Sequence, residues 1–419
     1  MTKGRALIVG SLILAIQTGC GVPRESGDMF DQQQVQDASF YTYWQARVPL
    51  QKGDTVSNCY LVDDNLYVTS DKGHLFALQA DKGLLRWCLK ITEPDYTIYP
   101  PTHLVAPDGR GPVVVVTTTR IGVFDRYSGD ALLSTPIPFP PAGGAVGDMT
   151  RLYLGSNDGN MYSLLWSHPY GDEPIERWRL TTSSPIASTP GFIAPDTLFF
   201  TTERGCVVSC GGFDKRAMWT SRTEGAIMAD PFVDESGVYV ASLDRSVYRF
   251  DLSSGAVLWR FRMPKPVRDA PKVAGHTCYQ YCDGTGITAI DTDTGQQKWR
   301  REDAVSLLAT FSGEAAVQTS GGSIDVVDIG TGKTGRSFGA EGVSSTVCNT
   351  SGDAIFMATA NGRITCIQPA DTPYLRHQEV AASKAYINRP PFKQTEGQVA
   401  PARSQEIGAS DPFRSRRDR

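Results

Sequence analysis

The sequence has little net charge, few histidines and no long apolar run, and each shortage narrows what the protein can do. Lysine and arginine number 41 against 45 acidic residues, so the formal net charge is −4 over 419 residues. Such a chain has no overall electrostatic attraction for the phosphate backbone of nucleic acids or for anionic lipid. We therefore expect no nucleic-acid partner.

Residues that could carry chemistry are scarce. No two of the five histidines have the spacing of a zinc site on one element, and no Gly-x-Ser-x-Gly nucleophile elbow occurs. The run Gly330-Thr-Gly-Lys-Thr looks like a phosphate loop, but Val327 stands where that motif needs another glycine. The sequence thus predicts no catalytic residue, no metal site and no cofactor. The histidines are His74, His103, His168, His276 and His377.

Eight of the nine cysteines follow Cys20. Cys206 and Cys210, like Cys278 and Cys282, are four residues apart in segments that resemble strands, which places the members of each pair roughly 13 Å apart on one face. That separation is beyond the reach of a disulfide. We predict buried, unreactive thiols for most of them rather than a disulfide scaffold.

The first apolar run covers residues 6–16 and follows two basic residues. It is too short to span ~30 Å of hydrocarbon as a helix, so it predicts a secretory signal over residues 1–19. Thr18-Gly19-Cys20 resembles the lipobox of bacterial lipoproteins. That resemblance implies a lipid on Cys20 and, with Gly21 after it, sorting to an outer membrane. The alternative is an ordinary secretory signal with a free cysteine.

What the sequence does have is a repeat. Six of the seven tryptophans recur at intervals close to 40–45 residues, with Leu133 and Arg336 at the same place in weaker copies. A period of this length, with several short strands in each unit, is typical of the blades of a β-propeller. The six are Trp44, Trp87, Trp178, Trp219, Trp259 and Trp299.

Other features share this period. In five copies a glycine stands four residues before the tryptophan position, within Asp- and Ser-rich runs that suit tight hairpin turns. Short segments rich in Val, Tyr, Phe and Leu precede these turns and predict the second and third strands of each unit. The glycines are Gly83, Gly129, Gly255, Gly295 and Gly332.

The number of units can be counted in two ways. Eight copies of the first three strands end near Gln368, and eight fourth strands begin with the one around Trp44. Pairing the lone fourth strand at residues 40–50 with the last incomplete unit would close a ring and remove its exposed edges. We therefore predict an all-β fold, an eight-bladed β-propeller of four-stranded antiparallel blades closed by an N-terminal strand, with seven and nine blades as alternatives.

The unit Asp-x-x-x-Gly-x-x-x-Trp, clearest at 251–259 and 291–299, resembles the repeat of quinoprotein-like propellers, which are named after pyrroloquinoline quinone (PQQ) alcohol dehydrogenases. The resemblance covers residues 39–372 and implies that the six tryptophans dock neighbouring blades. The resemblance also implies PQQ-dependent oxidation as an alternative activity. The chain, however, has no adjacent cysteines and no match to the calcium ligands of those enzymes.

Within that family, a lipid-anchored eight-bladed chain is most similar to an accessory lipoprotein of the machinery that assembles outer-membrane β-barrels. The resemblance implies a monomeric, non-enzymatic scaffold that binds other envelope proteins. The alternatives are a quinoprotein oxidoreductase and a cell-envelope propeller that binds a ligand or polysaccharide.

The ends differ in composition from the repeat. Residues 20–38 are polar and predict a flexible tether, and residues 373–419 predict a disordered tail. The last residues include four arginines and only one acidic residue, Asp418, so they could touch an acidic surface, although a solvated tail is the alternative that we favour. The arginines are Arg414, Arg416, Arg417 and Arg419.

Overall fold

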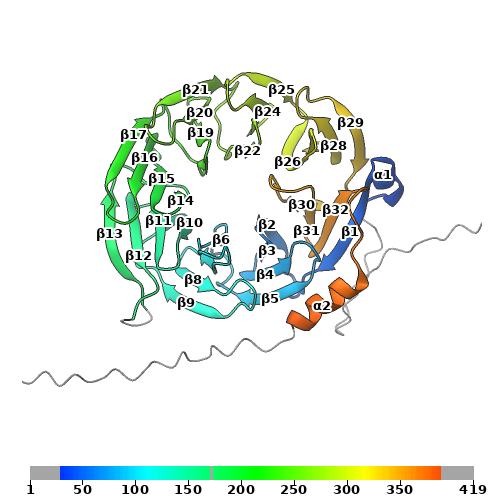
Figure 1. The fold of residues 1–419 in the computed structure, drawn as a ribbon, viewed down its shortest axis with the longest axis horizontal. Coiled ribbons are helices and arrows are strands. Elements are labelled where there is room, and N and C mark those ends of the chain that lie inside the picture. The colour runs from blue at the N-terminus through cyan, green and yellow to red at the C-terminus, as the bar shows by residue number, and fades with distance from the viewer. Residues whose placement is uncertain (1–28, 170–172, 388–419) are drawn as a thin grey trace, which may run out of the picture.

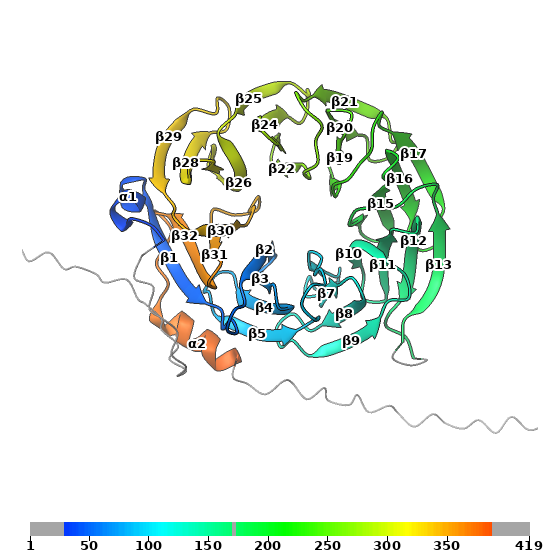
Figure 2. The ribbon, with the colours of Figure 1, turned by 180° about the vertical axis from the view of Figure 1, so that it is seen from behind.

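The computed structural model describes residues 29–169 and 173–387. In these residues the chain forms eight four-stranded antiparallel sheets, arranged as blades around a central axis (Figure 1). The first strand of each blade lies toward the axis and the fourth at the perimeter, which is equally clear from behind (Figure 2). The predicted eight-bladed, all-β propeller is confirmed.

Blades are numbered in chain order, and the strands of each blade run from the innermost to the outermost. Blade 1 has β2 (Val56–Val62), β3 (Asn65–Ser70), β4 (His74–Gln79) and β5 (Leu85–Lys90). Blade 2 has β6 (Thr102–His103), β7 (Val113–Val116), β8 (Arg120–Phe124) and β9 (Ala131–Pro136). Blade 3 has β10 (Pro141–Gly147), β11 (Arg151–Ser156), β12 (Asn160–Leu165) and β13 (Ile175–Thr181). Blade 4 has β14 (Gly191–Ile193), β15 (Thr197–Thr201), β16 (Cys206–Gly211) and β17 (Ala217–Arg222).

The other four blades follow the same order. Blade 5 has β18 (Phe232–Asp234), β19 (Gly237–Ser242), β20 (Ser246–Phe250) and β21 (Val257–Arg262). Blade 6 has β22 (Lys272–Ala274), β23 (Thr277–Cys282), β24 (Gly286–Asp291) and β25 (Gln297–Arg301). Blade 7 has β26 (Ala304–Phe311), β27 (Glu314–Thr319), β28 (Ser323–Asp328) and β29 (Thr334–Gly339). Blade 8 has β30 (Val343–Thr346), β31 (Ile355–Thr359), β32 (Arg363–Pro369) and β1 (Phe40–Arg47).

The outer strand of blade 8 comes from the other end of the chain. Strand β1 pairs antiparallel with β32, and Trp44 lies opposite Cys366. The segments on either side of this pairing are more than 300 residues apart in the sequence.

The core lies between the blades rather than within them. The middle strands are buried on both faces, as in β3 and β4, because each sheet packs against the sheets on either side. Outer strands such as β21 alternate between exposed and buried residues. Since one blade cannot cover its own two apolar faces, its stability depends on its neighbours.

All eight outer strands carry a β-bulge directly before the tryptophan position. Between β20 and β21 the residue pairing shifts at Arg249 and Phe250 of β20, so Leu258 of β21 is the extra residue and Trp259 follows it. A bulge bends its strand and re-aims the next side chain. The weaker copies at Leu133 and Arg336 keep the bulge, which shows that they hold the same structural position.

The predicted hairpin turns are present before the outer strands. The carboxylate of Asp251 accepts the backbone N–H groups of Ser253 and Ser254, and Gly255 has a φ of +70°. A positive φ favours glycine because it lacks a Cβ atom. The aspartate and glycine of the repeat therefore serve the turn.

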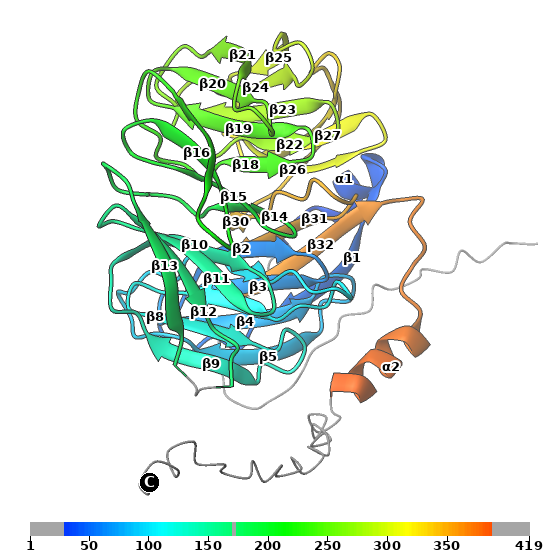
Figure 3. The same ribbon diagram turned by 60° about the vertical axis from the view of Figure 1, so that its left-hand side comes forward.

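Two regions predicted to lack structure contain helices. Helix α1 (Gln32–Asp37) is capped by Asp31, and Phe30 and Val35 are buried in a cluster with Phe338 of blade 7. The predicted flexible tether is therefore wrong for residues 29–38, because their few apolar side chains find a place between blades 7 and 8. Helix α2 (His377–Ile387) likewise contradicts disorder over those residues of the tail, and it lies outside the ring (Figure 3).

Candidate functional site

The six repeated tryptophans are buried on outer strands and contact the next blade. Each indole Nε1–H donates to a backbone carbonyl in the turn before the next outer strand, at 2.6–3.1 Å. Each ring also lies 5.9–6.0 Å from an aromatic ring on the second strand of its own blade. The accepting residues are Ala80, Arg126, Gly212, Leu252, Thr292 and Ile329. These contacts support the predicted docking role, which the Trp259 variants below test.

The two weaker copies differ from each other. Arg336 donates from Nη1 to the backbone carbonyl of Ala38 at 3.2 Å, and its guanidinium lies 5.3 Å from the centre of the Phe40 ring. It therefore bridges blade 7 and the N-terminal segment in place of an indole. Leu133 is buried but has no side-chain donor, so its contact with blade 3 is apolar.

The cysteines are mostly buried thiols, as predicted. All eight described cysteines are free, and five of them are buried. Burial raises the pKa of Cys59, Cys210 and Cys278 to about 12, so these thiols stay protonated at neutral pH. Cys20, the predicted lipidation residue, lies outside the described residues, as does the predicted signal peptide.

The motifs that looked chemical are structural where the structure describes them. The run from Gly330 to Thr334 is the turn between β28 and β29, where Thr331 binds the carboxylate of Asp328. Within residues 29–169 and 173–387, no group of three or more His, Cys, Asp or Glu is placed to hold a metal ion. No helix in the same residues is long and apolar enough to cross a membrane.

A cleft of about 550 Å³ lies between blades 8 and 1 and is the strongest candidate for a binding site. Four aspartates line it: Asp63 in the β2–β3 turn, Asp81 in the β4–β5 turn, Asp353 before β31, and Asp371 after β32. Apolar atoms of residues such as Phe356 complete the lining. Among the described residues that line this acidic cleft, none is lysine or arginine.

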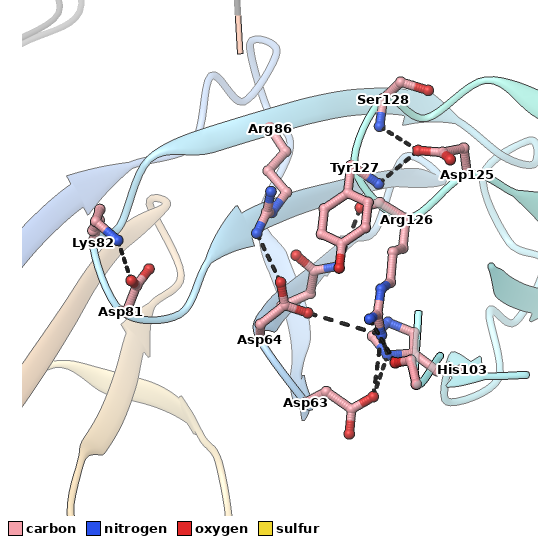
Figure 4. Close-up of polar contacts among 12 residues, drawn as sticks. Asp63, Asp64, Asp81, Lys82, Arg86, His103, Asp125, Arg126, Tyr127 and Ser128 are labelled. Carbon is pink, nitrogen blue, oxygen red and sulfur yellow. Dashed lines mark hydrogen bonds and ion pairs between the residues drawn. The ribbon is translucent and has the colours of Figure 1, made fainter. Parts of the chain in front are cut away.

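Two of these aspartates already have cationic partners. Asp81 pairs with Lys82, and Asp63 Oδ2 lies 2.7 Å from His103 Nδ1 and 3.3 Å from Arg126 Nη1 (Figure 4). For Asp353 and Asp371, no ion pair occurs among the described residues. The cleft therefore keeps uncompensated negative charge on its blade 8 side.

The partners of Asp63 form a polar network between blades 1 and 2. His103 Nε2 lies 2.8 Å from the hydroxyl of Tyr67, which is fully buried. Arg126 also donates from Nη2 to the backbone carbonyl of Gly109 at 2.8 Å. In Figure 4 the side chains of Asp63, His103 and Arg126 point toward one another from two blades. This network fixes the β2–β3 turn, where Asp63 has a φ of +49°.

We predict that the stabilising effect of Asp63 disappears in acid. The hydrogen bond from His103, together with the charges of His103 and Arg126, lowers the pKa of Asp63 from its ordinary value, although burial opposes this shift. A carboxyl group whose pKa is lowered by folding stabilises the fold above its unfolded pKa of about 3.9, and this stabilisation is lost as the pH falls through the folded value. Unfolding free energies of the wild type and Asp63→Asn should therefore differ at neutral pH and converge as the pH falls through the lowered pKa of Asp63.

The control is Glu235→Gln, which removes an exposed carboxylate that forms no ion pair in the described part of the chain. Its unfolding free energy should follow that of the wild type across the same pH range. A difference between wild type and Asp63→Asn that stays the same from neutral pH to strong acid would show that the Asp63 charge contributes nothing.

No pattern in the sequence points to the acidic cleft. Its residues come from positions 61–81 and 349–373, which belong to the first and the last copy of the repeat, and its aspartates lie in turns and loops of those copies. The sequence indicates only that the first and last copies of the repeat become neighbours when the ring closes. Even then, no spacing rule picks out four aspartates in four different loops.

Eight four-stranded blades, six of them with the repeated tryptophan on the outer strand, define the class of this protein: it is a PQQ-like repeat β-propeller. A family model described as outer membrane protein assembly factor BamB matches residues 165–260 and 247–372. The chain is thus a propeller of the BamB-like kind, similar in architecture to that assembly factor. No curated protein sequence matches it.

Two solved structures have the same fold. BamB from Moraxella catarrhalis has a TM-score of 0.62 at 15% sequence identity, with 80% of this chain and 99% of that chain covered. The computationally designed Ika8 protein has a TM-score of 0.59 at 13% identity, with 77% and 98% covered. At these identities the likeness concerns the fold alone.

Proposed function

We propose that this protein is a lipid-anchored interaction scaffold that assists the assembly of β-barrel proteins into an outer membrane. The observation that carries the proposal is the match of residues 165–372 to the family model of a BamB assembly factor, on a chain that folds as eight blades. Thr18-Gly19-Cys20 supplies the attachment point for the lipid. On this proposal the protein is not an enzyme and acts as a monomer.

A propeller suits this role physically. The six interblade hydrogen bonds of the tryptophans attach the turn between the third and fourth strands of one blade to its neighbour. A rigid array of loops binds partners with little loss of conformational entropy. The acidic cleft offers one surface with a distinct charge, and a lipid on Cys20 would confine the whole array to the membrane surface.

The test is a cross-linked pull-down of the membrane-bound protein, with co-purified proteins identified by mass spectrometry. Wild type is compared with Cys20→Ser, which removes the sulfur that would carry the lipid. We expect the wild type to recover a component of the β-barrel assembly machinery and the variant to recover severalfold less, because it no longer shares the membrane surface.

A variant that keeps Cys20 serves as the control for the loss of the membrane anchor. Trp259→Phe keeps a ring between blades 5 and 6 and should recover the same partner as the wild type. If neither the wild type nor this variant recovers a specific partner, the scaffold proposal is wrong, and reconstitution with PQQ and calcium becomes the next measurement.

A further inference from the structure

The acidic cleft shows a strong imbalance of charge within one chain. Four carboxylates line it without any lysine or arginine among the described lining residues, and Asp353 and Asp371 have no ion-pair partner there. The opposite imbalance occurs at the end of the same chain, where Arg414, Arg416, Arg417 and Arg419 surround one acidic residue. The two features carry complementary charge.

We propose that the acidic cleft is a docking site for an arginine-bearing peptide, and that its occupant is this chain's own C-terminal segment, residues 414–419. The inference goes beyond the proposed function, because it concerns a contact within one molecule. It does not require a lipid on Cys20 or a partner in the membrane.

The form of the cleft suits arginine. A volume of about 550 Å³ is within the range of roughly 300–1,000 Å³ that ligand pockets have, so the cleft can admit one or two extended side chains. Arginine pairs an apolar stem with a planar group of five donors, which can bind two carboxylates at once. Phe356 and Leu61 offer apolar surface for the stem, and the aspartates offer the acceptors.

The two sides of the cleft differ in the charge that they offer. Asp63 and Asp81 are paired with His103, Arg126 and Lys82, so a new cation gains less from them. Asp353 and Asp371 lie on the blade 8 side and are free of such partners in the described residues. The structure therefore assigns the main contacts of the arginines to Asp353 and Asp371.

The course of the chain makes the contact accessible. Residues 371–373 line the cleft, so the chain leaves the propeller at its edge before forming α2. Helix α2 ends at Ile387, and its eleven residues are roughly 16 Å long. The 26 residues between 388 and 413 can span at most about 90 Å, several times the distance needed to return along α2.

Covalent attachment compensates for a weak contact. Exposed ion pairs contribute little individually and are screened by salt, so a free peptide of this sequence should bind weakly. A tethered segment, however, is present at an effective concentration of the order of millimolar. The cleft would therefore be occupied by the segment in the isolated protein, and a basic partner would have to displace it.

The experiment measures binding of a fluorescent peptide with the sequence of residues 408–419 to the full-length chain by fluorescence anisotropy. Four proteins are compared: the wild type; a tail-neutral chain with Arg414, Arg416, Arg417 and Arg419 changed to Gln; that chain with Asp353→Asn and Asp371→Asn; and that chain with Glu235→Gln and Glu302→Gln. The last is a matched control, because it removes two exposed carboxylates from other blades: Glu235 lies between β18 and β19 of blade 5, and Glu302 lies between blades 6 and 7.

We expect the peptide to bind the tail-neutral chain, and to bind the wild type at least about twofold more weakly because the tethered segment competes for the cleft. Removing Asp353 and Asp371 should weaken binding about three- to tenfold, whereas the Glu235 and Glu302 changes should have no effect. Equal affinity for wild type and tail-neutral chain would overturn the proposed occupant. Equal affinity with and without the two aspartates would overturn the cleft as the site.

Sedimentation velocity distinguishes the chain's own segment from that of a second copy. At the same protein concentrations, the wild type should sediment as a monomer. A dimer that is lost in the tail-neutral chain would contradict the intramolecular contact.

Discussion

Trp259→Ala is expected to lower the free energy of unfolding by about 3 to 5 kcal/mol. Trp259 is buried between blades 5 and 6, where its Nε1–H donates to the carbonyl of Thr292 at 2.6 Å. In the alanine variant the carbonyl of Thr292 loses the hydrogen bond from the indole, and a cavity remains because the rigid sheets cannot close over it. Chemical denaturation followed by circular dichroism measures the loss.

The neighbouring residue provides the control. Leu258 is the bulge residue of the same strand, and its side chain is half exposed. Leu258→Ala should change the unfolding free energy by no more than about 0.5 kcal/mol. If Trp259→Ala costs as little as Leu258→Ala, the tryptophan of the repeat does not dock the blades.

A substitution at Gly295 of blade 6 tests the contact between Trp259 and the next blade from the opposite side. The φ of Gly295 is +68°, and an added Cβ would lie 2.6 Å from Cγ of Trp259. Gly295→Ala should therefore destabilise the wild type more than it destabilises Trp259→Ala, where the clash with the ring is gone. Equal costs in both backgrounds would mean that only the backbone conformation, and not the packing, requires glycine.

Arg126→Ala is expected to have the second large effect, a loss of about 2 to 3 kcal/mol of unfolding free energy. The side chain is 5% exposed and binds Asp63 and the carbonyl of Gly109. Removing it leaves that carbonyl without its donor and takes one cation from the network of His103 and Asp63. Solvent around Asp63, which is 63% exposed, limits the ionic part of the cost.

Arg110→Ala is the matched control, because Arg110 is an exposed arginine in the β6–β7 loop, next to the Gly109 that Arg126 contacts, and forms no ion pair in the described residues. The unfolding free energies of the two variants should differ by about 2 kcal/mol. Similar stabilities would show that the polar network between blades 1 and 2 does not hold them together.

The repeat could be read from the sequence because most of its copies pack against the next blade in the same way. The indole of Trp219 donates to a carbonyl of the next blade and packs on Gly255 there. The carbonyl recurs for all six tryptophans and the glycine for five, whereas Lys215 stands at the glycine position of blade 4. The count of eight followed from that period. Even the copy at Arg336, which has no indole, kept its spacing because the bulge and turn remain.

The ends were harder to predict. Phe30 and Val35 lie in a polar segment with no periodic pattern, and only the apolar surface between blades 7 and 8 gives them a reason to be buried. Likewise, nothing in the composition after residue 373 sets α2 apart. Local sequence carries little information where a segment's structure depends on a distant surface.

The sequence by itself determined the class of fold, the number of blades and the residues that join them, because these depend on contacts that repeat at a fixed spacing. Only the tertiary structure decided where charge gathers. Asp63, Asp81, Asp353 and Asp371 belong to turns of different copies, and they share one cleft because blades 1 and 8 are neighbours in the ring. A site built from both ends of the chain exists only once the propeller has formed.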